Sequence, residues 1–227
     1  MYYPELNAVW PEGVVPEEYF PSLQYYRHFV QNLYRDISVT PEDAAAVADA
    51  LQTSLGHDAP AAASAHVTAS SAAVASSSTL ASLVKIVVVT EDWCGDSAVT
   101  VPYISRLAET IGVPIRIFRQ SVFTDLKQWY VDDGTTHIPT VSVLHDNGEV
   151  VRELFRWIER PAAAHERVQG WVAEHPDFRE LMKRKDSDDD AAKAYFKLYA
   201  QLLRDMSSWY RGGLWREIAR EFAAGLK

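Results

Sequence analysis

The sequence of this 227-residue chain predicts an α/β fold with a central mixed β-sheet flanked by helices. Residues 83–89 are mostly β-branched, which is typical of a buried central strand. Strand-like and helix-like segments then alternate in the order β-α-β-α-β-β-α through residue 173. Asp146, Asn147 and Gly148 form a hairpin turn signal between the last two strands. A hairpin added to β-α-β crossovers makes the sheet mixed.

Helices are predicted before this core. Residues 1–20 are rich in proline and aromatic residues, which indicates an extended arm. Over residues 17–37, apolar and aromatic side chains recur at intervals of three and four, which predicts one amphipathic helix. A second helix begins with Thr40 as its N-cap and Pro41 at its first position, and it is expected to end near Gly56.

Residues 59–82 are mostly Ala and Ser, so they offer little to bury. We interpret them as a flexible connection, although alanine can also extend a helix. The predicted organisation therefore has four parts. They are an N-terminal arm with helices (1–58), an Ala/Ser-rich linker (59–82), the α/β core (83–175), and an acidic loop with a C-terminal helix that packs on the core (176–227).

Within the core, the elements follow from their apolar patterns. The predicted strands are 83–89, 114–118, 140–144 and 149–154, and the predicted helices are 95–111, 123–131 and 161–173. Gly112 is expected to stop the first of these helices.

The C-terminal part is expected to begin with a charged loop. Its acidic run, Asp186 to Asp190, is interpreted as solvated, with its last aspartates capping the next helix. That long final helix is predicted over 191–224, interrupted near Gly212 and Gly213.

Composition restricts the function classes. The chain is 48% hydrophobic and 23% charged, which is ordinary for a globular protein. Its formal net charge of −9 would repel phosphate backbones, so no nucleic-acid partner is expected. No apolar stretch of ~18 residues predicts a membrane span, and the N-terminus lacks the pattern of a secretory signal. We therefore expect a soluble, cytoplasmic protein without a membrane partner.

A single cysteine excludes an internal disulfide and a zinc site built from several cysteines. The run Asp188 to Asp190 does not resemble a metal-binding loop and has no partner cluster, so no metal site is predicted.

Two motifs carry a resemblance to a known family. Residues 87–97 read Val-Val-Val-Thr-Glu-Asp-Trp-Cys-Gly-Asp-Ser, and residues 137–141 read His-Ile-Pro-Thr-Val, followed by Asp-Asn-Gly-Glu-Val at 146–150. Together they resemble the thioredoxin family, and the first looks closest to the bacterial branch with a Glu-Asp-Trp-Cys-Gly-Asp motif. The resemblance covers residues 83–173 and implies a thioredoxin-like fold.

The candidate nucleophile is Cys94, at the predicted N-terminus of a helix. Backbone N–H groups and the positive end of the helix dipole meet there, and both favour a thiolate. Gly95 permits a tight turn that leaves the sulfur accessible, and Trp93 is expected to shelter one side of it. Glu91, Asp92 and Asp96 add negative charge that opposes the thiolate, so the sequence leaves the sign of the pKa shift open.

The chain departs from a dithiol enzyme of the family at two positions. Ser97 replaces the second cysteine of Cys-x-x-Cys, so a mixed disulfide on Cys94 cannot be resolved within the chain. Val88 stands six residues before Cys94, where thioredoxins keep a buried aspartate. Cys94 and Ser97 are the predicted catalytic residues, with the Ser97 hydroxyl either bonding the thiolate or capping a backbone N–H.

The resemblance also implies a substrate site. It implies that the Ile138–Pro139 bond is cis and that the turn faces the cysteine, where the Ile138 backbone would pair with an extended peptide. His137 is interpreted as a loop residue rather than an acid–base group. The predicted substrate-binding residues are Trp93, Gly95, Asp96, Ile138 and Pro139.

Three functions remain open. The first is a single-cysteine thiol–disulfide oxidoreductase that forms mixed disulfides with a client protein or glutathione and needs no cofactor. The second is a redox-inactive binding module with the same fold. The third is a monothiol glutaredoxin-like carrier of glutathione or an iron–sulfur cluster, which lacks support because no Gly-Gly-x-Asp type of turn follows the proline. No oligomeric state is predicted.

Overall fold

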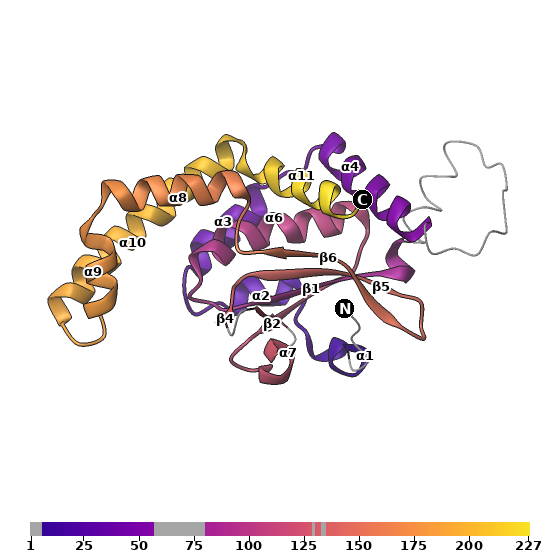
Figure 1. Ribbon diagram of the computed structural model, residues 1–227, viewed down its shortest axis with the longest axis horizontal. Helices are drawn as coiled ribbons and strands as arrows, with labels where there is room; N and C mark the ends of the chain where they lie inside the picture. Colours follow the sequence, from indigo (N-terminus) through magenta and orange to yellow (C-terminus); the bar gives the residue numbers. More distant parts are fainter. Residues whose placement is uncertain (1–5, 57–79, 129, 133–134) are drawn as a thin grey trace. The chain divides into compact units, whose positions relative to one another are not determined.

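The computed structural model describes residues 6–56, 80–128, 130–132 and 135–227 (Figure 1). The chain divides into two compact units. The first unit comprises Met1–Glu159 together with Ile218–Lys227, and the second comprises Arg160–Glu217. The predicted linker falls almost entirely on residues 57–79, which lie outside the described residues.

A four-stranded mixed sheet forms the centre of the first unit, as predicted. Its strands are β1 (Val84–Thr90), β2 (Ile115–Arg119), β5 (Thr140–Asp146) and β6 (Val151–Ile158). The order is β2-β1-β5-β6, with β1 parallel to β2 and β5 antiparallel to both β1 and β6. The β1 strand is therefore central, which explains why Ile86–Val89 within it form an apolar, β-branched run.

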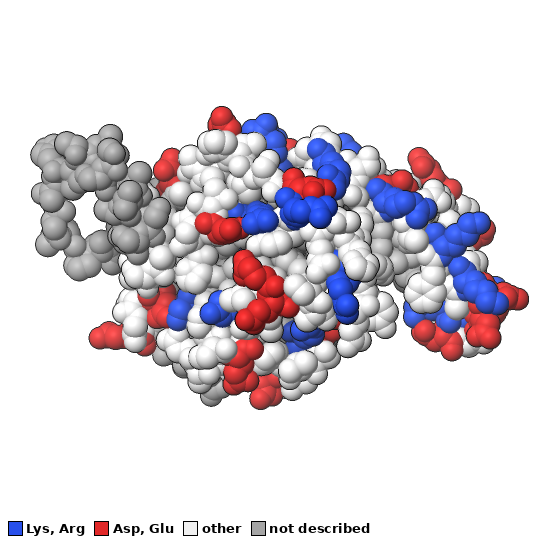
Figure 2. Space-filling model, turned by 180° about the vertical axis from the view of Figure 1, so that it is seen from behind, with Lys and Arg blue, Asp and Glu red and all other residues white. Residues whose placement is uncertain are grey.

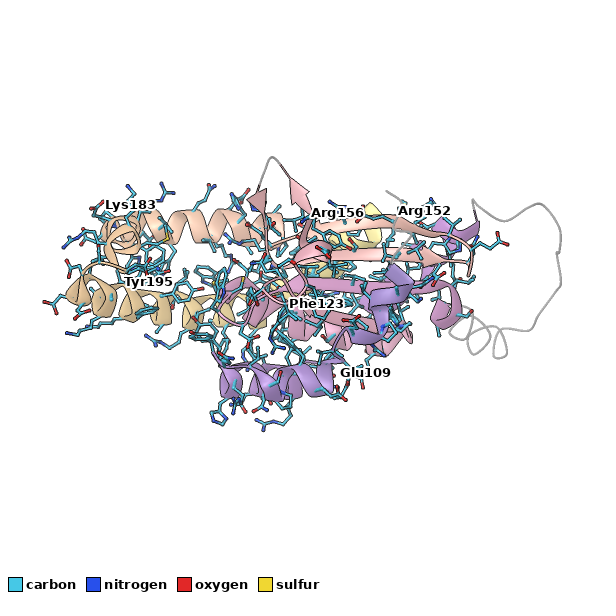
Figure 3. The ribbon with its side chains drawn as sticks, turned by 90° about the horizontal axis from the view of Figure 1, so that it is seen from below. Glu109, Phe123, Arg152, Arg156, Lys183 and Tyr195 are labelled. Carbon is cyan, nitrogen blue, oxygen red and sulfur yellow. The ribbon has the colours of Figure 1, made fainter. Side chains whose placement is uncertain are left out.

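Helix α6 (Gly95–Ile111) lies on one side of the sheet with α4 (Pro41–Gly56). Helices α1 (Leu6–Val9) and α7 (Thr124–Gln128) lie on the other side (Figure 1). The predicted apolar stripe of α6 is buried, and Gly112 ends the helix in the left-handed conformation with a φ of 73°. The opposite side of the sheet holds a second hydrophobic cluster around Phe118, against which Phe123 packs (Figure 3).

The last part of the chain packs in the first unit. Helix α11 (Trp215–Gly225) brings Phe222 against Phe155 and Trp157 of β6, with ring centroids 5.5 and 6.1 Å apart. The Trp157 indole N–H also donates to Glu221 at 2.7 Å. Residues distant in sequence are thus joined through aromatic contacts and one polar contact.

The single helix predicted over residues 17–37 was wrong. The structure has two helices there, α2 (Pro16–Ser22) and α3 (Arg27–Asp36). Tyr26 between them has a φ of 56°, in the left-handed region that breaks a right-handed helix. Asp92, far along the chain, accepts the backbone N–H of Gln24 and so stabilises the break.

The extended arm was also wrong in part. Before α2, the chain forms α1 (Leu6–Val9) and a 3₁₀ turn, η1 (Trp10–Glu12). Leu6 is fully buried in the cluster on the α1 side of the sheet, and burial of such side chains stabilises a segment that is too short to be helical alone.

Two further predictions need correction. The charged region after residue 176 is not only a loop, since it contains α9 (Asp177–Arg184). The helix predicted over 123–131 is shorter, α7 (Thr124–Gln128), and a small hairpin of β3 (Val131–Asp132) and β4 (Thr135–Thr136) follows it. Short elements carry too few residues to show a clear period.

The second unit is helical. It holds α8 (Ala162–Glu174), α9, α10 (Asp189–Trp209) and a π-helical turn, η2 (Tyr210–Leu214), which lies at the interruption predicted near the paired glycines. Asp188 caps α10 by accepting the N–H groups of Asp190 and Ala191, as predicted for the end of the acidic run.

Aromatic rings form the core of this unit. Phe178 on α9 meets Trp171 edge-on and stacks on Tyr195, both with ring centroids 5.3 Å away (Figure 3 labels Tyr195). The Trp171 indole N–H donates to Asp205 of α10 at 2.9 Å. One aromatic cluster therefore holds three helices together.

Replacing Phe178 by Leu should lower the free energy of unfolding of this unit by about 1.5 kcal/mol, because ring contacts and buried area are both lost. Urea denaturation followed by tryptophan fluorescence measures the change. Phe196→Leu is the matched control: Phe196 is 59% exposed, so its change should stay within about 0.5 kcal/mol. Equal losses in both variants would refute the cluster's role.

The predicted N-cap of α4 offers a second test. The Thr40 hydroxyl accepts the backbone N–H of Asp43 at 3.2 Å. Thr40→Ala should therefore cost about 1 kcal/mol in thermal or urea unfolding. Thr53→Ala removes an exposed hydroxyl that donates to the Asp49 carbonyl within the same helix, and it should change stability by less than about 0.5 kcal/mol. A Thr40→Ala effect no larger than this control would contradict the cap.

Charged side chains of both signs are interspersed over the face seen in Figure 2. Within the described ranges, no helix combines the length and apolarity needed to cross a bilayer.

Candidate functional site around Cys94

Cys94 is the N-cap residue of α6, as the sequence predicts. Its backbone is extended, with φ −77° and ψ 119°, and its Sγ accepts the backbone N–H of Ser97 at 3.5 Å. The turn before it is closed by a hydrogen bond from the Cys94 N–H to the Glu91 carbonyl at 3.1 Å. The sulfur therefore sits at the N-terminus of a long helix, where the backbone N–H groups and the helix dipole favour a negative charge.

The loop before β5 lies against the sulfur. The Cys94 thiol donates to the Ile138 carbonyl oxygen at 3.3 Å, and the Ile138–Pro139 peptide bond is cis. Both loop residues are buried. The sheet register positions this loop, because Thr140 at the start of β5 pairs with Val89 near the end of β1.

Ser97 lies beside the sulfur, and its side chain hydrogen-bonds Cys94 as well as Thr90. The Thr90 hydroxyl donates to Ser97 Oγ at 2.5 Å, and both residues are buried. Thr90 is the last residue of β1, and sequence reasoning did not select it. Its one signal was that it is the polar residue that ends an apolar strand four positions before the cysteine.

The position of the missing aspartate is fully apolar. Val88 has no exposed surface and pairs across the sheet with Ile117 on one side and Val141 on the other. A carboxylate at that place would be costly without a partner. The site therefore has no buried acid from β1 to accept the thiol proton.

The three acidic residues near the sulfur have different roles. Asp92 is buried, and its carboxylate accepts from the Arg119 guanidinium at 2.7 Å, the Tyr19 hydroxyl at 3.3 Å and the Gln24 backbone N–H at 3.1 Å. Burial and the Asp92 charge hold the pKa of Tyr19 far above its usual range, so the hydroxyl stays a donor. The Asp92 charge is thus satisfied by three groups.

Glu91 is likewise engaged, since it accepts the Ser121 N–H at 2.6 Å. Asp96, in the first turn of α6, is the carboxylate that acts on the thiol. Three carboxylates were expected to oppose the thiolate, and Asp96 is the one that does so in the structure.

The N-terminal helices cover the sulfur, which sequence reasoning missed. A cavity of about 10 Å³ beside Cys94 is lined by Tyr19 and Phe20 of α2, Leu23 of the turn after it, and Val30 of α3. Cys94 itself is only 7% exposed.

Burial decides the protonation state of the thiol. Removal from water is the largest cause and the Asp96 charge the second, and together they raise the pKa of Cys94 from 9.0 to about 11. Hydrogen bonds from Ser97 and from the backbone at Asp96 oppose the shift but do not outweigh it. The sequence left the direction of the pKa shift of Cys94 open, and in the structure the shift is upward.

The other predicted site residues differ in exposure. Trp93 is 53% exposed, while Gly95 is buried and Asp96 is half-buried. His137 is exposed, and its Nδ1 lies 2.8 Å from Glu159 Oε1, in line with its interpretation as a loop residue.

Comparison with known families now decides the family. A model of the thioredoxin family matches residues 50–174, which is more than half of the chain. The chain belongs to the thioredoxin family. Its mixed sheet, flanking helices and C-terminal helix accordingly form a thioredoxin-like fold.

The remaining comparisons add little to this assignment. The comparison with curated proteins gives no match. Among solved structures, an HIV epitope scaffold is 18% identical with a TM-score of 0.36, covering 93% of this chain and 97% of its own. A Pseudomonas aeruginosa protein of unknown function is 19% identical with a TM-score of 0.35, covering 88% and 98%. Likenesses at this level carry no functional argument.

Proposed function

We propose that this thioredoxin-family chain performs thiol–disulfide exchange with Cys94 as its single reactive group. The observation that carries the proposal is the position of Sγ at the start of α6, 3.3 Å from the Ile138 carbonyl that precedes the cis-proline. In that position the helix N-terminus stabilises a thiolate.

The exchange balances with one external thiol. Cys94 first loses its proton to water, and its thiolate attacks one sulfur of a client disulfide or a glutathionylated client. A mixed disulfide on Cys94 forms as the old S–S bond breaks, and the leaving thiolate takes up a proton. An external thiol such as glutathione then attacks the mixed disulfide, is itself oxidised into a disulfide, and regenerates the Cys94 thiol. Ser97 cannot do this, because a hydroxyl does not exchange with disulfides.

The client would lie along the cis-proline turn. An extended segment pairing with the Ile138 backbone would bring its sulfur toward Cys94, in the manner of strand addition. Exposed Trp93 offers an apolar surface beside the sulfur, and Gly95 and Asp96 would border the same segment. A reducing cytoplasm would supply the external thiol.

Transfer of glutathione tests the proposal. The full chain is incubated with a glutathionylated peptide, and the protein mass is followed before and after addition of free glutathione. We expect a single glutathione adduct on the wild-type chain, its release by free thiol, and no adduct on Cys94→Ser. Absence of an adduct at pH 9, even in a variant whose Cys94 alkylates rapidly, would contradict the proposal.

A second candidate is a redox-inactive binding module. The burial of Cys94, with its pKa near 11, favours this candidate because few thiols are ionised at neutral pH. In that case the cis-proline turn would bind a partner while Cys94 serves as a core residue. The glutathione experiment separates the two, since a module forms no adduct under any condition in which the fold persists.

A further inference from the structure

The segment between Val14 and α3 crosses the sulfur and is anchored at both ends. On one side, Val14 pairs with Ile117 of β2 through backbone bonds of 3.0 and 2.9 Å. On the other side, Arg106 of α6 donates to the Tyr34 carbonyl at 2.9 Å and stacks over the Tyr34 ring at 3.9 Å, which fixes α3. Helix α2 and the turn after it lie between these anchors.

Apolar side chains of this segment face the cysteine. Tyr19, Phe20 and Leu23 are each at most 3% exposed, and all three line the cavity beside Cys94. The contact is closed by polar groups as well. Asp92, two residues before the cysteine, holds the Tyr19 hydroxyl and the Gln24 N–H.

Arg119 joins Asp92 in these polar contacts, and we call the two residues the latch. The Arg119 guanidinium donates to Asp92 and to the Ser22 hydroxyl at 2.8 Å, and it lies 4.6 Å from the centroid of the Tyr19 ring. The polar contacts named here between the segment and the cysteine loop thus meet at the Asp92 carboxylate and the Arg119 guanidinium.

The segment has features of a part that can open locally. Helix α2 has only seven residues and contains Pro21, so it is too short to persist without these contacts. Tyr26 at its junction with α3 has a left-handed φ of 56°, a conformation that is strained for a tyrosine and is common in switch regions. Contiguous segments of a fold can open as separate cooperative units while the rest stays folded.

We propose that residues 15–26 form a displaceable cover that gates access to Cys94, latched by Asp92 and Arg119. The proposal rests on the proposed function for its biological meaning, since the cover would restrict exchange to clients that displace it. Opening removes the burial that is the main cause of the raised thiol pKa, and leaves the helix N-terminus to favour the thiolate.

Alkylation of Cys94 in the native full chain measures the opening. The rate with iodoacetamide is recorded at pH 8 over a range of low urea concentrations, and compared with the rate of the same chain unfolded in high urea. The ratio of the two gives the open fraction. A local opening has a weak urea dependence, whereas global unfolding has the full dependence of the equilibrium transition.

We expect wild-type Cys94 to react at least 100-fold slower than the unfolded chain, with weak urea dependence. Leu23→Ala should raise the native rate at least tenfold. Leu51→Ala is the matched control: Leu51 is equally buried, in α4, and its side chain does not line the cavity. This variant should raise the native rate less than twofold while lowering global stability comparably.

A second variant tests the cover even if Leu23→Ala fails to fold. Tyr19→Phe with Ser22→Ala removes the two hydroxyls that bond to the latch and keeps the apolar contacts, and we expect a rate increase of at least threefold. The proposal is overturned if wild-type Cys94 reacts at the unfolded rate, if its rate follows global unfolding, or if Leu51→Ala accelerates it as much as the cover variants.

Alkylation needs only an exposed thiol, so the two proposals fail separately. A cover variant that alkylates rapidly but accepts no glutathione would leave the cover standing and remove the exchange function. A wild-type chain that accepts glutathione and alkylates at the unfolded rate would overturn the cover and leave the exchange function standing.

Discussion

Replacing Arg119 by Met should lower the free energy of unfolding by about 3 kcal/mol, because it leaves the Asp92 carboxylate buried without its cation. Asp92 keeps 9% of its side-chain surface exposed and Arg119 keeps 22% of its own, so the carboxylate would stay largely shielded from water after the guanidinium is lost. Equilibrium urea denaturation followed by circular dichroism gives the value.

The control for Arg119→Met is an exposed pair. Arg35 lies 3.4 Å from Asp36 with 72% of its side chain exposed, so Arg35→Met should change stability by less than about 0.5 kcal/mol. Adding Asp92→Asn to Arg119→Met should recover part of the loss, since the unpaired charge is removed. If Arg119→Met and Arg35→Met cost the same, the Asp92 network does not stabilise the cysteine loop.

Stability should fall at alkaline pH because of Cys94. The unfolded chain releases the thiol proton near pH 9, whereas the folded chain keeps it up to about pH 11. Between these values the unfolded state binds fewer protons, so the free energy of unfolding decreases as the pH rises. The contribution is fully present below the unfolded pKa, and between ~2 and 3 kcal/mol is lost as the pH passes through the folded pKa.

The difference in the free energy of unfolding between wild type and Cys94→Ala isolates the contribution of the Cys94 thiol. Tyr19 and Tyr34 also have raised pKa values in the folded chain and so also lower its stability at alkaline pH, but they do so in both proteins. Urea unfolding is measured at several pH values from 7 to 11, and the wild type should lose stability relative to Cys94→Ala. Parallel stability curves would contradict a buried, protonated thiol.

Local patterns carried much of the fold. Three local signals predict the strands of the sheet and the helix packed on one side of it. They are the apolar residues of β1, the apolar stripe and terminal glycine of α6, and the Asp-Asn-Gly turn of the hairpin. These signals are strong because each depends on residues close together in sequence. Helix α6 also carries Cys94 at its N-cap, so the centre of the site follows from the same pattern.

The surroundings of the site could not be predicted in this way. Tyr19 and Arg119 lie 73 and 27 positions from Asp92 in sequence, and their meeting depends on the tertiary fold. The continuous amphipathic pattern over residues 17–37 concealed the break at Tyr26, because a period reports which side chains are buried and not where the backbone turns. The raised pKa of Cys94 depends on its burial beneath the cover of residues 15–26, which the pattern also did not reveal.

Ser97 shows how a local inference can be right in part. Its backbone N–H and its side chain both bond Cys94, as predicted, but its hydroxyl also accepts from Thr90. The second partner could not be predicted locally, because it depends on where the end of β1 lies beside α6. The roles of Trp93, Gly95, Asp96, Ile138 and Pro139 in substrate binding remain predictions.

Direct titration of Cys94 tests most sharply whether burial holds its thiol protonated. The pH dependence of thiolate absorbance in the full chain is recorded with Cys94→Ser as the blank, in the wild type and in Leu23→Ala. We expect a pKa well above 9 in the wild type and a lower value in Leu23→Ala, where the sulfur is more open to water. A wild-type pKa at or below about 7 would contradict it, because the thiol would then be ionised at neutral pH with the cover in place.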